Sequence, residues 1–231
     1  MTLRRNGASS AAFTTTELIV AIVIVAVVAL LAWPTITSAL QKREMTRTMN
    51  NVRELYLAGF HMATDGAAKS DGNLAWPGDY PAATLAEYCG KLVQNDYLKA
   101  GDLQRILSAP GASCTVISTT GPPATVTLSG KSALKVYKAK NSDPSTTVFA
   151  ASSNYVYDTA LSPNAKPFGD AGFVVVHKSG DAGLFGKNQA TPAGFENNPV
   201  KFQSPIGIGR LPGAADGVVS PGDGATVLTG P

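Results

Sequence analysis

The chain has 231 residues, a formal net charge of +3, 15% charged residues and 44% hydrophobic residues. This length leaves room for a membrane segment and one folded head rather than several domains. A charge balance so close to neutral gives no electrostatic basis for nucleic-acid binding. The 23 glycines and 15 prolines predict a head rich in loops.

Residues 1–12 form a short polar leader that contains Arg4 and Arg5 and ends in small side chains. The next 21 residues, FTTTELIVAIVIVAVVALLAW from Phe13 to Trp33, contain a single charged side chain. At about 1.5 Å per residue a helix of this length extends roughly 30 Å, the thickness of the hydrocarbon core of a bilayer. Because a lone segment in lipid must satisfy its backbone groups internally, residues 13–33 are predicted to span the membrane as a helix.

The single charge in this segment is Glu17. An ionisable group at the membrane end of a spanning helix is costly and usually has a partner. One interpretation is local: Glu17 complements the helix N-terminus beside the capping candidates Thr14, Thr15 and Thr16. The other is that Glu17 pairs with a second subunit.

The arrangement of leader, Phe13, threonines, Glu17 and apolar run resembles the N-terminus of type IV pilins and of type II secretion pseudopilins. In that family the leader is cleaved just before a Phe, which is then N-methylated, and a Glu four residues later pairs with the terminal amine of a neighbouring subunit. Phe13 and Glu17 match these positions (17 − 13 = 4), and Pro34 falls where many members carry a helix-kinking proline. The chain has Ala12 before the cleavage point, where the family usually has Gly. The resemblance covers about residues 4–59.

The resemblance implies cleavage between Ala12 and Phe13, methylation of Phe13, and an assembly role for Glu17 and Pro34. It implies four kinds of partner: further copies and other pilin-like subunits, a prepilin peptidase and methyltransferase, an assembly platform in the inner membrane, and membrane lipid. The expected function is that of a structural subunit in a type IV pilus-like or type II secretion filament. The sequence leaves open which filament this is and whether the subunit is major or minor.

Arg4 and Arg5 place the N-terminus in the cytoplasm by the positive-inside tendency, although Lys42 and Arg43 weaken the asymmetry. The head is therefore expected outside the cytoplasm, in a single-pass inner-membrane protein that becomes part of a periplasmic or extracellular filament. The alternatives are an anchored binding protein that never polymerises and a secreted protein cleaved after Ala39. The apolar run of about 16 residues slightly exceeds the usual length of a signal peptide core.

Residues 34–64 continue as a helix, because apolar side chains recur every three or four residues from Met45 to Met62. The first part is expected to form a stalk and the part from Met49 onward to pack against the head. Pro34 predicts a bend or local unwinding. Thr64, Asp65 and Gly66 are expected to end the helix, with Gly66 as its cap.

The head, residues 65–231, is expected to have an α+β fold of the type IV pilin-like form, with the long helix packed on a small antiparallel sheet. Helical spacing marks 82–98 and 102–107, whereas residues from 115 onward favour short strands. The predicted strands are 115–118, 124–129, 133–139, 146–151 and 172–178. From about 190 the chain is rich in Gly and Pro, which predicts an extended loop and a mobile C-terminus.

Cys89 and Cys114 are the only cysteines, so one intramolecular disulfide is possible outside the cytoplasm. Closing this loop of about 25 residues would stabilise the head by roughly 3 kcal/mol. The alternative is two free, buried thiols.

No catalytic constellation is evident, and the chain is expected not to be an enzyme. Neither His61 nor His177 has the spacing of a metal site, and no nucleophile elbow or Walker-type loop is present. No cofactor is expected apart from calcium, for which oxygen donors cluster at Asp65, Asp71, Asn73 and Asp79, with Asp216 and Asp223 as a second group. Acidic residues in such turns more often serve as turn formers.

Overall fold

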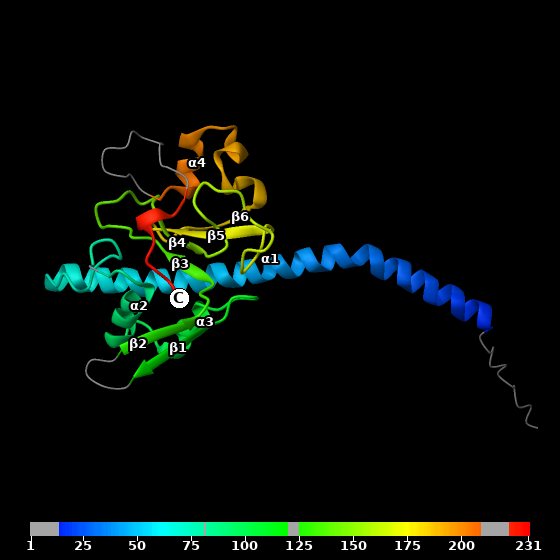
Figure 1. Cartoon of the computed structure of the whole chain (residues 1–231), viewed down its shortest axis with the longest axis horizontal. Helices are drawn as coiled ribbons and strands as arrows, with labels where there is room; N and C mark the ends of the chain where they lie inside the picture. The colour runs from blue at the N-terminus through cyan, green and yellow to red at the C-terminus, as the bar shows by residue number, and fades with distance from the viewer. Residues whose placement is uncertain (1–13, 81, 120–124, 209–221) are drawn as a thin grey trace, which may run out of the picture. The chain divides into compact units, whose positions relative to one another are not determined.

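The computed structural model describes residues 14–80, 82–119, 125–208 and 222–231, and the side chain of residue 225 lies outside this description. The chain divides into two units, residues 1–40 and 41–231. One helix, α1 (Thr15–Lys69), supplies the described structure of the first unit and continues into the second. The second unit contains the head together with the second half of α1, which is accompanied there by shorter helices and two antiparallel sheets (Figure 1).

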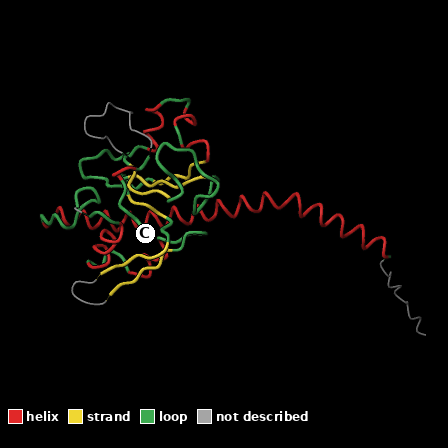
Figure 2. The backbone as a smooth tube through the Cα atoms, viewed as in Figure 1, coloured by secondary structure: helices red, strands yellow, loops and turns green. Residues whose placement is uncertain are grey.

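The head has an α+β fold, as expected, and its elements follow in a simple order (Figure 2). After α1 come two short helices, a two-stranded sheet, a four-stranded sheet and then mainly helical turns. Their bounds are α2 (Leu85–Gln94), α3 (Ala100–Ile106), β1 (Cys114–Thr119), β2 (Thr125–Gly130), β3 (Leu134–Val136), β4 (Val148–Ser152), β5 (Gly172–His177), β6 (Ala182–Gly186), η1 (Lys187–Ala190), η2 (Pro192–Phe195), α4 (Pro199–Ile206) and η3 (Gly224–Thr226).

The second half of α1 packs into the head through the predicted apolar stripe. Met45, Val52, Leu55 and Met62 are all buried. Tyr56 packs edge-on against Phe149 of β4, with ring centroids 5.5 Å apart, and its hydroxyl donates to the Lys178 carbonyl at 2.8 Å. In Figure 1 the four-stranded sheet and the α2, α3, β1 and β2 layer lie on opposite sides of this part of α1. The stripe therefore serves as the centre of the head core.

The helix does not end at residue 64 as predicted, because α1 continues to Lys69. Gly66 is a buried residue inside the helix rather than its cap, and Ser70 has the left-handed φ of 53° that ends it. The chain then folds back so closely that a Cβ on Gly66 would lie 1.7 Å from the Leu74 carbonyl oxygen. The glycine therefore permits the backbone at Leu74 to approach α1 closely. The prediction considered Gly66 only as a helix cap and did not include this contact.

The four-stranded sheet has the order β3-β4-β5-β6 and is antiparallel throughout. All five predicted strands are present, but they belong to two sheets, since β1 pairs only with β2 among the described strands. β6 was not predicted. It forms a hairpin with β5 through a turn in which Gly180 has a φ of 86°, and Phe173 stacks on Phe185 at 5.3 Å.

The described residues after 190 contain more secondary structure than predicted. α4 buries Phe202 and Ile206 against the sheet. At the C-terminus Val227 forms a bridge with Tyr137, and Thr229 forms one with Thr84. The predicted loop thus includes a helix, and the end of the chain is attached to the head by backbone hydrogen bonds.

Candidate functional site: the N-terminal helix

The first half of α1 presents large apolar side chains to its surroundings on every side. Leu18, Val25, Leu30 and Trp33 are between 55% and 75% exposed. The most apolar 18-residue window has a mean hydropathy of 2.8, and none of it is buried within the described structure. A core helix would be largely covered by its own chain. By length and composition this helix is suited to cross a membrane and to act as an anchor.

Glu17 takes part in a reciprocal capping box at the start of α1. Its Oε2 accepts hydrogen bonds from the Thr14 backbone N–H and hydroxyl, both at 2.8 Å, and its own N–H donates to the Thr14 hydroxyl at 3.2 Å. The same Thr-x-x-Glu arrangement starts α2, where Glu87 accepts from the Thr84 and Ala83 N–H groups. The local role considered for Glu17 is therefore present in the single chain, with Thr14 as the capping residue.

Pro34 lies inside α1, and the chain remains helical on both sides of it. The local unwinding that was considered there is absent from the described helix. Proline removes one backbone donor, while the neighbouring hydroxyls bond back to the helix: Thr37 donates to the Pro34 carbonyl and Ser38 to that of Thr35, both at 3.0 Å. The helix is continuous through Pro34, and these two hydroxyls bond to carbonyl groups of the same helix.

The predicted processing residues, Ala12 and Phe13, lie outside the described residues, as does Asp216. Cleavage before Phe13 and its methylation therefore stay predictions. The first described residue is Thr14, whose contacts with Glu17 lie directly beside the predicted cleavage point.

Cys89 and Cys114 are free thiols in the structure, which corrects the predicted disulfide. Cys89 lies in α2 and Cys114 begins β1, and both are buried in the same core cluster. Burial raises the pKa of both thiols, and the neighbouring Cys114 raises the pKa of Cys89 further. Packing among apolar side chains accommodates them as thiols, which is the alternative that the sequence left open.

Because their pKa values are raised and both side chains are buried, the two thiols are expected to resist alkylation in the folded chain. Maleimide labelling of the native full chain, followed by mass spectrometry, should add no label within minutes. Labelling after denaturation without reductant should add two. If the denatured, unreduced chain takes up no label but a reduced sample takes up two, then a disulfide is present after all.

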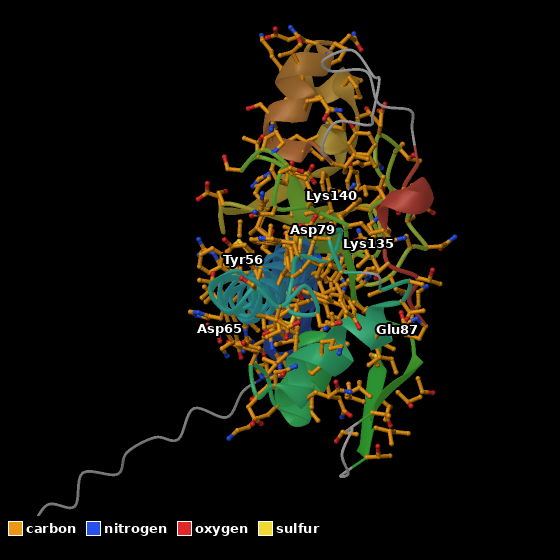
Figure 3. The ribbon with its side chains drawn as sticks, turned by 90° about the vertical axis from the view of Figure 1, so that its left-hand side faces the viewer. Tyr56, Asp65, Asp79, Glu87, Lys135 and Lys140 are labelled. Atoms are coloured by element: carbon orange, nitrogen blue, oxygen red, sulfur yellow. The ribbon has the colours of Figure 1, made fainter. Side chains whose placement is uncertain are left out.

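The four proposed calcium residues each have other partners. Tyr97 donates to Asp65 at 2.7 Å, the Asn141 N–H donates to Asp79 at 2.6 Å, and Asn73 donates twice to Asp71. The bonds from Asn73 are the main cause of the lowered pKa of Asp71. Figure 3 shows Asp65 and Asp79 well apart. Within the described residues no group of three or more His, Cys, Asp or Glu side chains is placed to hold a metal ion.

Sequence reasoning missed a buried ion pair in the head. Lys135 of β3 and Asp223, which precedes η3, approach to 2.5 Å between Nζ and Oδ2. Their side chains are 10% and 22% exposed. Asp223 was considered only as a calcium donor. An alternating strand containing a lysine gives no signal that its partner lies 88 residues later in the chain.

A comparison of the chain with models of known protein families finds no match, and comparisons with curated proteins and with solved structures find none either. The resemblance to pilins and pseudopilins therefore stays a prediction, which depends on the sequence around Phe13 and Glu17.

Proposed function

We propose that the chain is a structural subunit of a type IV pilus-like or type II secretion filament, with a type IV pilin-like fold. Its role is assembly rather than catalysis. The observation that supports this most strongly is the exposed apolar half of α1, which continues without a helical break into the half that forms the centre of the head core. A subunit of this form exchanges lipid contacts for contacts with like helices.

The apolar half of α1 requires an apolar environment. Burying one large aliphatic side chain stabilises a protein by about 1.5–3 kcal/mol relative to exposure in water. A side chain such as Leu30, 75% exposed in the single chain, accordingly needs either lipid or other helices around it. Lipid provides this apolar environment before assembly, and the helices of neighbouring subunits provide it in the filament.

In this proposal Glu17 sets how neighbouring subunits align along the filament. A carboxylate enclosed by apolar helices needs a cationic partner, and the amine created by cleavage before Phe13 is such a cation on every neighbouring copy. A peptidase that also methylates, and a membrane platform that drives extraction, are required as partners. In this proposal the subunit starts in the inner membrane, with its head outside the cytoplasm, and its final location is a filament.

A static single-pass anchor is the second candidate function. The hydrogen bonds between Thr14 and Glu17 favour it, because they give the Glu17 carboxylate partners without any second subunit. Cleavage after Ala39 would also preserve the head, since the first buried residue of α1 is Met45.

The mature N-terminus distinguishes these functions. The full chain, purified in detergent from its own host, is analysed by intact mass spectrometry and N-terminal peptide mapping. We expect a chain that begins with N-methyl-Phe13. A start at Leu40 would instead establish a secreted protein, and retention of Arg4 and Arg5 would establish a static anchor. Either of these results would overturn the filament proposal.

A further inference from the structure

Lys135 and Asp223 bring a primary amine and a carboxyl group together in the head. Lys135 is the middle residue of the three-residue strand β3, on the side of the head that carries the C-terminal segment (Figure 3). Its Nζ lies 2.5 Å from Asp223 Oδ2 and also donates to the Tyr155 carbonyl. Only 10% of the lysine side chain is exposed. The two groups are in contact before any further movement of the chain.

The pair lies among three buried tyrosines, and the rings of two of them face the amine. Tyr137, Tyr155 and Tyr157 are each 1% exposed, and the Lys135 Nζ lies 5.4 Å and 5.6 Å from the ring centroids of the first two. Burial lowers the pKa of Lys135, against the opposing influence of Asp223. An amide forms from a neutral amine and a carboxylic acid, and a proton passed from Nζ to Oδ2 converts the pair into these two forms.

The two carboxyl oxygens of Asp223 have different partners. Oδ1 accepts from the Tyr137 hydroxyl at 3.0 Å and from the Tyr157 backbone N–H at 3.2 Å. Oδ2 is the atom beside the amine. One oxygen is therefore held by two donors that would stabilise negative charge on it, while the other lies where it receives protons from Nζ.

We propose that Lys135 and Asp223 condense to an intramolecular amide, which makes this pair a self-modification site. After the first proton moves from Nζ to Oδ2, the Nζ lone pair attacks Cγ. The electrons of the carbonyl double bond move onto Oδ1, where Tyr137 and Tyr157 donate to it. A second Nζ proton passes to Oδ2, the Cγ–Oδ2 bond breaks, and one water leaves as the double bond to Oδ1 forms again.

The step balances without an oxidant, a reductant or a co-reactant. An ammonium group and a carboxylate become an amide and one water, so the net charge of the chain is unchanged. One N–H remains on Nζ and keeps its acceptor, the Tyr155 carbonyl. The product replaces one buried and one partly buried charge by a neutral group, and this removes the cost of keeping the ion pair out of water.

The amide would attach the C-terminal segment to the sheet covalently. In the structure this segment is held without a covalent bond, by the ion pair, by the packing of Leu228 in the core, and by hydrogen bonds from Leu228 N–H to the Val136 carbonyl at 2.9 Å and from Lys138 N–H to the Thr226 carbonyl at 2.7 Å. A bond between residues 135 and 223 closes a loop that contains β4, β5, β6 and α4. The inference is independent of the proposed filament role, because it concerns the head alone.

The test is peptide mapping of the full chain after folding and reduction. Trypsin cuts after Lys131, Lys138 and Arg210 but not after an acylated lysine, so we expect a branched peptide that joins 132–138 to 211–231. Its mass should equal the sum of the two peptides less one water, and fragmentation should place the link at Asp223. Separate peptides 132–135 and 136–138, with the full sequence mass intact, would overturn the proposal.

Matched variants assign the two ends of the link. Asp216→Ala alters the same tryptic peptide and should leave the branched product unchanged, whereas Asp223→Ala should abolish it. Lys135→Arg keeps a cation beside Asp223 without an amine that acylates readily, and it should give the full sequence mass. A link that persists in either Asp223→Ala or Lys135→Arg would refute this pair as its site.

Discussion

Replacing Glu17 by alanine is expected to abolish filament assembly while the chain still inserts into the membrane. Removing one partner of a buried ion pair costs about 3–5 kcal/mol. A loss of 3 kcal/mol corresponds to roughly a 100-fold weaker association per subunit. Insertion should persist, because the change removes the only charge between Phe13 and Trp33. Sheared or pelleted filaments should be lost, and the membrane fraction should keep its full amount of chain.

Alanine also removes the capping box, so a second variant is needed to separate the two roles of Glu17. Glu17→Gln keeps a side-chain oxygen that accepts from the Thr14 N–H, but it carries no charge. If pairing with a neighbouring amine is what matters, the glutamine variant should fail to assemble as fully as the alanine variant. Normal filaments from Glu17→Gln would show that Glu17 acts only as a helix cap.

The long apolar helix and the general composition of the head could be predicted from the sequence because each depends on local patterns. An apolar run without charges predicts a spanning helix whatever lies around it, and the spacing from Met45 to Met62 indicates one buried face. Strands such as Gly172–His177 are marked by consecutive valines. The structure contains the apolar helix, its buried face and these strands.

The errors arose where contacts between distant residues decide the structure. Gly66 is typical of a helix cap, but its actual constraint comes from the Leu74 carbonyl, which only the folded-back loop brings close. The small β6, AGLFG, has weak strand propensity and forms by pairing with β5. Likewise, nothing in the chain near Asp223 indicates that its partner is Lys135.

Gly66→Ala is expected to destabilise the head by about 2–4 kcal/mol, the largest loss we expect from adding a single methyl group. The new Cβ would lie 1.7 Å from the Leu74 carbonyl oxygen, 2.7 Å from its carbon and 2.9 Å from the Asp71 carbonyl oxygen. These are backbone atoms, so no side chain can rotate away. The loop would have to move outward, exposing Leu74 and Trp76, which are 8% and 7% exposed in the structure.

The measurement is urea unfolding of the full chain in detergent. Unfolding is monitored by the fluorescence of Trp76 in a Trp33→Phe background. Gly101→Ala is the matched control, because it adds the same methyl group to a helix where no atom lies within 4 Å. It should leave stability unchanged or raise it by up to about 1 kcal/mol, since alanine is the better helix former. If Gly66→Ala unfolds at the same urea concentration as Gly101→Ala, then the Leu74 carbonyl does not approach α1 closely at Gly66. Gly66 would then be an ordinary position near the end of a helix.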